Sequence, residues 1–137
     1  YQLAFKEKYC LFDLDWRMET GYKAAEQLFA SQKDSADFPS ALLLANDLLA
    51  LGFMDYCGEH QILIPEDISI VSFDNIVYSS LNQIQLTTVS QHAETMSSEA
   101  ANLMIQLLNN PNQETRRVIL EPTLIVRNTT CAYHDKP

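Results

Sequence analysis

The stretch 65–75, PEDISIVSFDN, constrains the fold of this chain more than any other part of its sequence. Pro65 ends whatever element precedes it, and residues 68–73 are rich in the β-branched and aromatic side chains that favour a buried strand. Asp74 and Asn75 follow directly, at the corner where this strand becomes a loop. In open parallel α/β sheets, ligands bind in the crevice that such corners line.

The rest of the chain alternates between expected strands and expected helices. Apolar runs predict further strands at 41–45 and 86–89, short strands at 118–120 and 124–126, and a weak strand at 10–14. Apolar residues at helical spacing predict helices at 18–31, 48–58 and 93–108, with a short turn or helix at 76–81. This alternation predicts one α/β domain with a mostly parallel sheet and helices on both faces. We expect the tail beyond Asn128 to be loose.

The composition limits the classes of partner. A chain of 137 residues, 47% of them hydrophobic, can bury one core without disulfides or metals, and no apolar run is long enough to span a membrane. The net charge of −9 argues against direct binding to nucleic-acid phosphates. Three cysteines without C-x-x-C spacing suit a reduced, cytoplasmic protein. The chain begins at Tyr1 without Met or a secretory leader, so we expect a fragment.

Four polar or aromatic residues follow four successive expected strands: Trp16, Asn46, Asp74 and Gln91. Because the carboxyl ends of parallel strands meet at one edge of the sheet, we expect these side chains to converge there. Amides donate and accept hydrogen bonds, an ionised carboxylate accepts from several hydroxyls, and a Trp face offers an apolar platform to a sugar ring. This set predicts a binding site for a small polyol.

Each of these residues also has an ordinary structural explanation. Asn46, like Asp47, can cap the helix that follows it. Asp74 can form an Asx turn with the next two residues, and Trp16 taken alone is more often a core residue than a ligand platform. Gln91 alone carries almost no information. Their shared position after strands, rather than any single identity, supports the site.

Motifs for catalysis or for a cofactor are weak. The three glycines are too widely spaced to form a dinucleotide- or phosphate-binding loop. His60, His92 and His134 are scattered, without a spaced partner for zinc or a nearby nucleophile. We therefore expect no catalytic residues, no metal site and no cofactor. An α/β enzyme stays an alternative only if a nucleophile and a base meet in the cleft.

The expected helix at 48–58 is apolar on two faces. Leu49 and Phe53 lie on one side when the helix is projected at 100° per residue, and Leu48 and Leu51 lie on the other. A helix of this kind must be covered twice. We expect its own sheet to cover one face and a second subunit to cover the other.

Four segments carry recognisable motifs: PSALLLANDLLALG at 39–52, IPEDISIVSFDN at 64–75, LTTVSQ at 86–91 and EPTLIVRNTT at 121–130. Together they resemble the lactose/galactose-repressor family of bacterial transcription regulators. The resemblance implies an effector-binding domain with two lobes of the type I periplasmic-binding-protein-like fold, preceded by a DNA-binding headpiece. Residues 1–91 would form the C-terminal lobe without its first strand, 92–110 the helix that packs on the N-terminal lobe, and 111–137 the closing strands and tail.

The resemblance also implies roles for single residues. Positions that match effector-contacting residues of the family are Trp16, Asn46, Asp74 and Gln91. Positions that match its dimer interface, or lie beside it, are Leu48, Leu51, Val77 and Leu81. The family's N-terminal lobe and headpiece lie upstream of this chain. The stripe Met96, Ala100, Leu103, Met104 and Leu107 would therefore lack its usual cover, and we expect it to be buried against a second chain or folded back.

The implied function is the sensing of a small sugar in the cytoplasm. Closure of the cleft around this effector would change the geometry of a homodimer and hence its affinity for operator DNA. DNA contact would run only through the N-terminal headpiece, and no membrane contact is expected. A sugar-binding protein of a transport system is the alternative.

Overall fold

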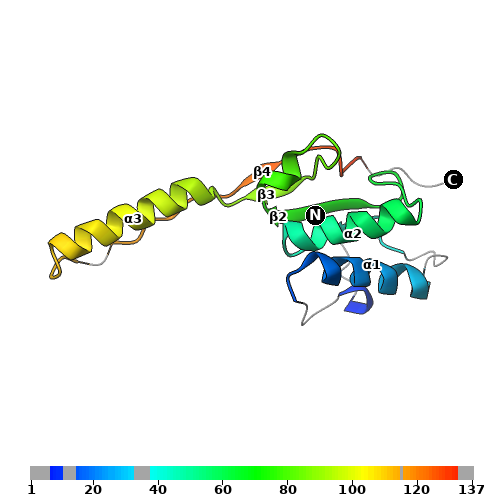
Figure 1. Cartoon of the computed structure of the whole chain (residues 1–137), viewed down its shortest axis with the longest axis horizontal. Helices are drawn as coiled ribbons and strands as arrows, with labels where there is room; N and C mark the ends of the chain where they lie inside the picture. Colours follow the sequence, from blue (N-terminus) through cyan, green and yellow to red (C-terminus); the bar gives the residue numbers. More distant parts are fainter. Residues whose placement is uncertain (1–6, 11–14, 33–37, 115, 133–137) are drawn as a thin grey trace.

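The structure is a computed structural model that describes residues 7–10, 15–32, 38–114 and 116–132 (Figure 1). The helices and strands of its body are α1 (Met18–Gln32), β1 (Ala41–Leu43), α2 (Asp47–Glu59), β2 (Ser69–Asp74) and β3 (Thr88–Ser90). Two short 3-10 helices are η1 (Glu7–Tyr9) and η2 (Val77–Ser80). The last two elements are α3 (Ala93–Asn109) and β4 (Thr123–Ile125). The expected helices and the central strands are therefore present.

The four strands form one sheet in the order β1-β2-β3-β4. The β1–β2 and β2–β3 pairs are parallel and the β3–β4 pair is antiparallel, so the predicted mostly parallel α/β sheet is confirmed. In Figure 1, α1 and α2 lie on the same side of the strands. Helix α1 packs on α2, and α2 packs on β2.

Two glycines allow the backbones of α1 and α2 to touch. A Cβ atom at Gly21 would stand 2.0 Å from the carbonyl oxygen of Leu49, and one at Gly52 would stand 1.8 Å from the carbonyl oxygen of Met18. No residue with a side chain fits at either place without moving a backbone. The sequence therefore fixes how closely the two helices approach.

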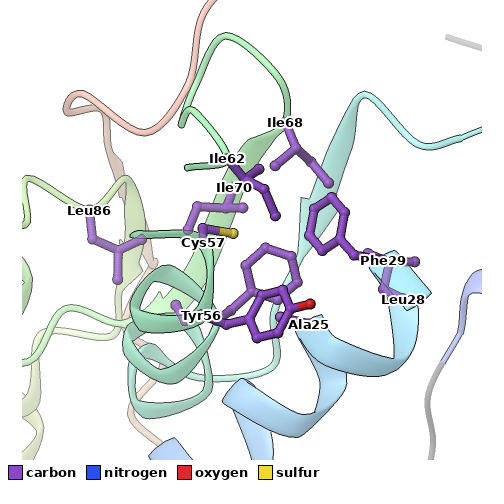
Figure 2. Packing of buried hydrophobic residues seen from close by; sticks show 11 residues of the cluster. Ala25, Leu28, Phe29, Tyr56, Cys57, Ile62, Ile68, Ile70 and Leu86 are labelled. Atoms are coloured by element: carbon purple, nitrogen blue, oxygen red, sulfur yellow. The ribbon is translucent and has the colours of Figure 1, made fainter. Parts of the chain in front are cut away.

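The hydrophobic core lies between these helices and the strands (Figure 2). Phe29 of α1 packs against Phe53 and Tyr56 of α2, with ring centroids 6.0 and 6.1 Å apart. Ile68 and Ile70, both at 0% exposure, complete the cluster from the strand side. Full burial of such a side chain contributes roughly 1.5–3 kcal/mol, so this cluster stabilises the scaffold that carries the strand ends.

Two expectations for the C-terminal part are wrong. Residues 118–120 lie outside any strand, because this segment runs back along α3 (Figure 1), where the described part of the chain offers no strand for it to pair with. The expected loose tail is wrong at Thr129, whose carbonyl oxygen accepts from the Ile70 amide at 2.8 Å and whose hydroxyl accepts from the Thr87 amide at 2.8 Å. The remainder of that expected tail, 133–137, lies outside the described residues. The weak strand predicted at 10–14 falls largely on 11–14, outside the described residues.

Helix α3 extends away from the body (Figure 1). None of its 17 residues is buried. The predicted apolar stripe consists of exposed Met96, Ala100, Met104 and Leu107, with Leu103 half-buried. The expectation that this stripe folds back on the chain is therefore wrong, whereas its burial against a second chain stays a prediction.

Candidate functional site

The ends of β2 and β3 bring two of the predicted ligand residues together. Asp74 is the last residue of β2 and pairs with Ser90, so Gln91 stands next to it. Gln91 Nε2 donates a hydrogen bond to Asp74 Oδ1 at 2.8 Å. Both side chains are half-buried. A carboxylate and an amide have more hydrogen-bonding capacity than this one contact uses, so the pair can also bind hydroxyl groups of a ligand.

The backbone at this corner adopts an uncommon conformation. Asp74 has φ 113° and Asn75 has φ 54°, and such positive values cost of order 1–3 kcal/mol each for residues other than glycine. The amides of Asn75 and Ile76 donate to Thr88 Oγ1 and Asp47 Oδ2, so the predicted alternative of an Asx turn at Asp74 is wrong. Strained backbone of this kind is often found at ligand sites.

The carboxyl group of Asp74 is also electrostatically perturbed. Burial raises its pKa from the ordinary value of 3.8, and the charge of Asp47 acts in the same direction, while the hydrogen bond from Gln91 opposes them. The net direction is upward. The position of this carboxyl group, at the carboxyl edge of a parallel sheet, is where open α/β folds bind ligands.

Asn46 is the N-cap of α2, so its capping alternative is confirmed. Its Oδ1 accepts from the Leu49 amide at 2.8 Å, and its Nδ2 donates to the carbonyl oxygen of Trp16 at 3.2 Å. The side chain is 6% exposed. The cap predicted at Asp47 is wrong, because Asn46 holds the extended conformation of a cap residue and Asp47 is already helical.

Asp47 instead forms the hydrogen-bond centre beneath the strand ends, a role that the sequence analysis missed. Its Oδ1 accepts from the hydroxyls of Ser72 and Thr88, the latter at 2.6 Å. Its Oδ2 accepts from the Ile76 amide at 2.8 Å and from the Ser79 hydroxyl at 2.5 Å. The signal that could have revealed it is the presence of Ser72 and Thr88, polar residues at 0% exposure inside apolar strands.

Arg127 supports the same corner from the C-terminal segment, which the sequence analysis also missed. Its guanidinium donates to Asn75 Oδ1 at 2.7 Å and to the Leu86 carbonyl oxygen at 2.6 Å, and its amide donates to Thr87 Oγ1 at 2.9 Å. The RNTT segment that β4 leads into is therefore tied to the end of β2.

Trp16 is 63% exposed, so the alternative that it is a core residue is wrong. Its carbonyl oxygen accepts the hydrogen bond from Asn46, which places its backbone beside the end of β1. Thus Asp74 and Gln91 are joined by one contact, and Asn46 and Trp16 by another. The position of the Trp16 ring toward a ligand stays a prediction.

The residues predicted for a dimer interface divide into two groups. Leu48, Val77 and Leu81 are 36%, 76% and 47% exposed, and Tyr78 beside them is 55% exposed. Leu51 is only 8% exposed because it is packed within the chain. An interface at this surface would therefore use α2 through Leu48 and η2 through its apolar side chains.

Neither a metal centre nor a membrane span is found in the described part of the chain. Within residues 7–10, 15–32, 38–114 and 116–132, the His, Cys, Asp and Glu side chains do not form a group of three that could hold a metal ion. No helix among these residues is long and apolar enough to cross a bilayer. Of the three free cysteines, Cys57 is buried, and this burial, with the charge of Asp67, raises its pKa to about 12.

Comparison with known proteins gives consistent matches. The periplasmic binding protein-like domain family matches residues 6–130. The HTH-type transcriptional repressor PurR of Pasteurella multocida (strain Pm70) is 31% identical over 121 residues, which make up 84% of this chain and 35% of the repressor. The crystal structure of a transcriptional regulator LacI from Bacillus cereus subsp. cytotoxis NVH 391-98 matches with a TM-score of 0.79 at 28% identity, covering 88% of this chain and 42% of that one.

A further solved structure includes a sugar. A LacI family transcriptional regulator from Enterococcus faecium, with bound ribose, matches with a TM-score of 0.73 at 27% identity, covering 85% of this chain and 41% of that one. These matches confirm the resemblance to the lactose/galactose-repressor family. The chain spans less than half the length of each of these relatives. The relatives are transcription regulators rather than enzymes.

Proposed function

Because the chain belongs to the periplasmic binding protein-like domain family, we propose that it is part of the effector-binding domain of a bacterial transcription regulator. Residues 1–91 form its C-terminal lobe, 92–110 a helix that crosses to the N-terminal lobe, and 111–137 the closing strands and tail. The single observation that carries the proposal is the half-buried Asp74–Gln91 pair at the carboxyl edge of the sheet. This is the edge at which α/β folds bind ligands.

The effector is a small sugar or sugar derivative. The Asp74 carboxylate accepts from its hydroxyls, the Gln91 amide both donates and accepts, and the exposed Trp16 ring packs against an apolar ring face. Asn46 contributes a contact while it caps α2. The ribose bound to the Enterococcus regulator supports this class of effector.

Partners follow from the same proposal. A second copy of the chain packs on the exposed side chains of Leu48, Val77 and Leu81, and closure of the cleft alters the geometry of this homodimer. Operator DNA is bound only through an N-terminal headpiece, since the net charge of −9 disfavours phosphate contact by this part. The protein acts in the cytoplasm without a cofactor.

The test is a thermal shift of the full-length gene product with a panel of sugars and nucleosides. A ligand at about 100 times its Kd stabilises the folded state by about 2.7 kcal/mol, which gives a measurable rise in Tm. The Asp74→Ala variant should lose this rise, and Asp55→Ala, an exposed Asp of α2, should keep it. A rise that survives in Asp74→Ala removes Asp74 from the site.

A sugar-capture protein of a transport system is the second candidate, because the matching family is described as periplasmic binding protein-like. The gene sequence upstream of Tyr1 distinguishes the two. A helix-turn-helix segment supports the regulator, whereas a secretory signal peptide supports the transport protein.

A further inference from the structure

Asp47 is the first residue of α2, and its side chain bonds to residues of β2, η2 and β3. This side chain has 0% exposure. It accepts four hydrogen bonds, from Ser72, Ile76, Ser79 and Thr88. A carboxylate has about four lone-pair sites, so this group is fully used by the protein and leaves none for a ligand. Asp47 can therefore affect ligand binding only by fixing the positions of the residues that donate hydrogen bonds to it.

The four bonds surround the strained corner. Ser72 precedes Asp74 by two residues and Ile76 follows it by two, and both donate to Asp47. The two positive φ angles at Asp74 and Asn75 thus lie between two anchors on one carboxylate. Backbone in such a conformation persists only where its surroundings determine it strongly.

The same carboxylate also holds the neighbouring strand. Thr88 Oγ1 donates to Asp47 Oδ1 at 2.6 Å and accepts from the Asn75 amide at 3.3 Å. Thr88 stands three residues before Gln91 in the chain. One buried group therefore determines where the end of β2 lies relative to the end of β3.

We propose that Asp47 is a positioning residue, which holds Asp74 and Gln91 where one polar ligand can contact both. The proposal rests on the function proposed for this pair. Hydrogen bonds to a charged acceptor are roughly twice as strong as neutral ones. Asp47→Asn therefore weakens the two bonds that its remaining oxygen accepts, and it abolishes the other two, because an amide NH2 group donates but does not accept. The corner then becomes mobile before the core does, since the four residues that donate to the Asp47 carboxylate all lie outside the core cluster.

The first test is amide hydrogen exchange in the Asp47→Asn variant, with Asp55→Asn in the same helix as the matched control. The reference is the Ile70 amide, which bonds to the Thr129 carbonyl oxygen in the core. In Asp47→Asn, the ratio of the Ile76 exchange rate to the Ile70 exchange rate should rise by roughly tenfold. A change of this size is expected when a hydrogen bond to a charged group is lost. An equal acceleration of both amides means a general loss of stability and overturns the proposal.

A milder pair of variants keeps the test valid if Asp47→Asn does not fold. Ser79→Ala removes one donor to Asp47, whereas Ser80→Ala removes a neighbouring hydroxyl that donates to the Val77 carbonyl oxygen. The exchange ratio should rise in Ser79→Ala, by less than in Asp47→Asn, and should stay unchanged in Ser80→Ala. Equal behaviour of the two serine variants overturns the proposal.

Calorimetric titration with D-ribose separates this proposal from the proposed function. If the parent protein binds ribose, Asp47→Asn should bind it about tenfold more weakly, and Asp55→Asn should bind it equally well. Equal affinity in Asp47→Asn overturns the positioning role alone. If the parent does not bind ribose, that effector is excluded, and the exchange ratios still decide whether Asp47 holds the corner.

Discussion

Helices α2 and α3 are both predicted from apolar residues at helical spacing, but the fold places them in opposite surroundings. Eight of the 13 residues of α2 are buried, whereas none of the 17 residues of α3 is. Helix α2 lies between α1 and the sheet, and α3 leaves the body with only the returning segment beside it (Figure 1). Periodicity therefore predicts that a helix forms, but the covering of its apolar face depends on what the rest of the fold places next to it.

The largest difference between the two regions should appear in the core. Phe53 of α2 is 2% exposed and lies among the aromatic rings, so Phe53→Ala should lower the free energy of unfolding by about 3–5 kcal/mol. Urea denaturation followed by circular dichroism measures this loss. A loss below about 1 kcal/mol would mean that α2 is packed as loosely as α3.

Two glycines of α2 sharpen the comparison within one helix. Gly52→Ala places a Cβ 1.8 Å from the Met18 carbonyl oxygen and should destabilise the chain, by about 1–3 kcal/mol or more as in other overpacked sites. Gly58 has nothing within 4 Å of an added Cβ, so Gly58→Ala should stabilise the helix by about 0.5–1 kcal/mol. Thermal unfolding of both variants measures whether each substitution lowers or raises the stability. Equal effects on stability would contradict the close contact between α1 and α2.

The candidate site should show a smaller, pH-dependent effect. The folded-state pKa of Asp74 lies above its ordinary value of 3.8, so its contribution to stability is full below pH 3.8 and is lost as pH rises through the folded pKa. Asp74→Asn removes this titration, and its Oδ1 can still accept from Gln91. Near neutral pH the variant should be more stable than the parent, by less than about 1 kcal/mol because the site is half-exposed.

Urea unfolding of the Asp74→Asn variant and its parent across the acid range measures this difference. The gain should disappear below pH 3.8, where the parent is protonated as well. Asp55→Asn, with an exposed side chain, serves as the control. A variant that is less stable than its parent at neutral pH would show that Asp74 is not destabilised by its burial.

The smallest effect is expected in α3. Leu108 is 73% exposed, so Leu108→Ser should change the unfolding free energy by no more than about 0.5 kcal/mol. The same unfolding measurement checks this. A large loss at low protein concentration would show that another part of the chain covers the helix, and a loss that grows with concentration would point to a second chain.

The sequence predicted the strand ends well because their signal is local. Asp74 directly follows the expected strand at 68–73 and Gln91 follows the one at 86–89 after Ser90, and the parallel pairing of β2 with β3 brings them together as expected. The same pairing predicts the position of the candidate site, at the carboxyl edge of the sheet, without knowledge of any tertiary contact. Residues at strand ends can be predicted in this way because only the order and the direction of the strands must be known.

The roles of Asn46 and Asp47 could not be assigned from sequence, because both residue types cap helices well. The choice depends on Ser72 and Thr88, which lie 25 and 41 positions from Asp47 in the chain. Likewise, Leu51 and Leu48 share an apolar face in projection, but only the fold determines that Leu51 is buried. Contacts over such distances in sequence become visible only in the structure.

The most direct measurement of the central claim is an NMR titration of the ¹⁵N-labelled full-length protein with the sugar panel. The side-chain amide of Gln91, which donates to Asp74 Oδ1, is the probe. We expect at least one sugar to shift this signal saturably, and Asp74→Ala to abolish the shift. A sugar that binds and shifts other signals while the Gln91 amide stays unmoved would contradict the claim that this strand-end pair holds the effector.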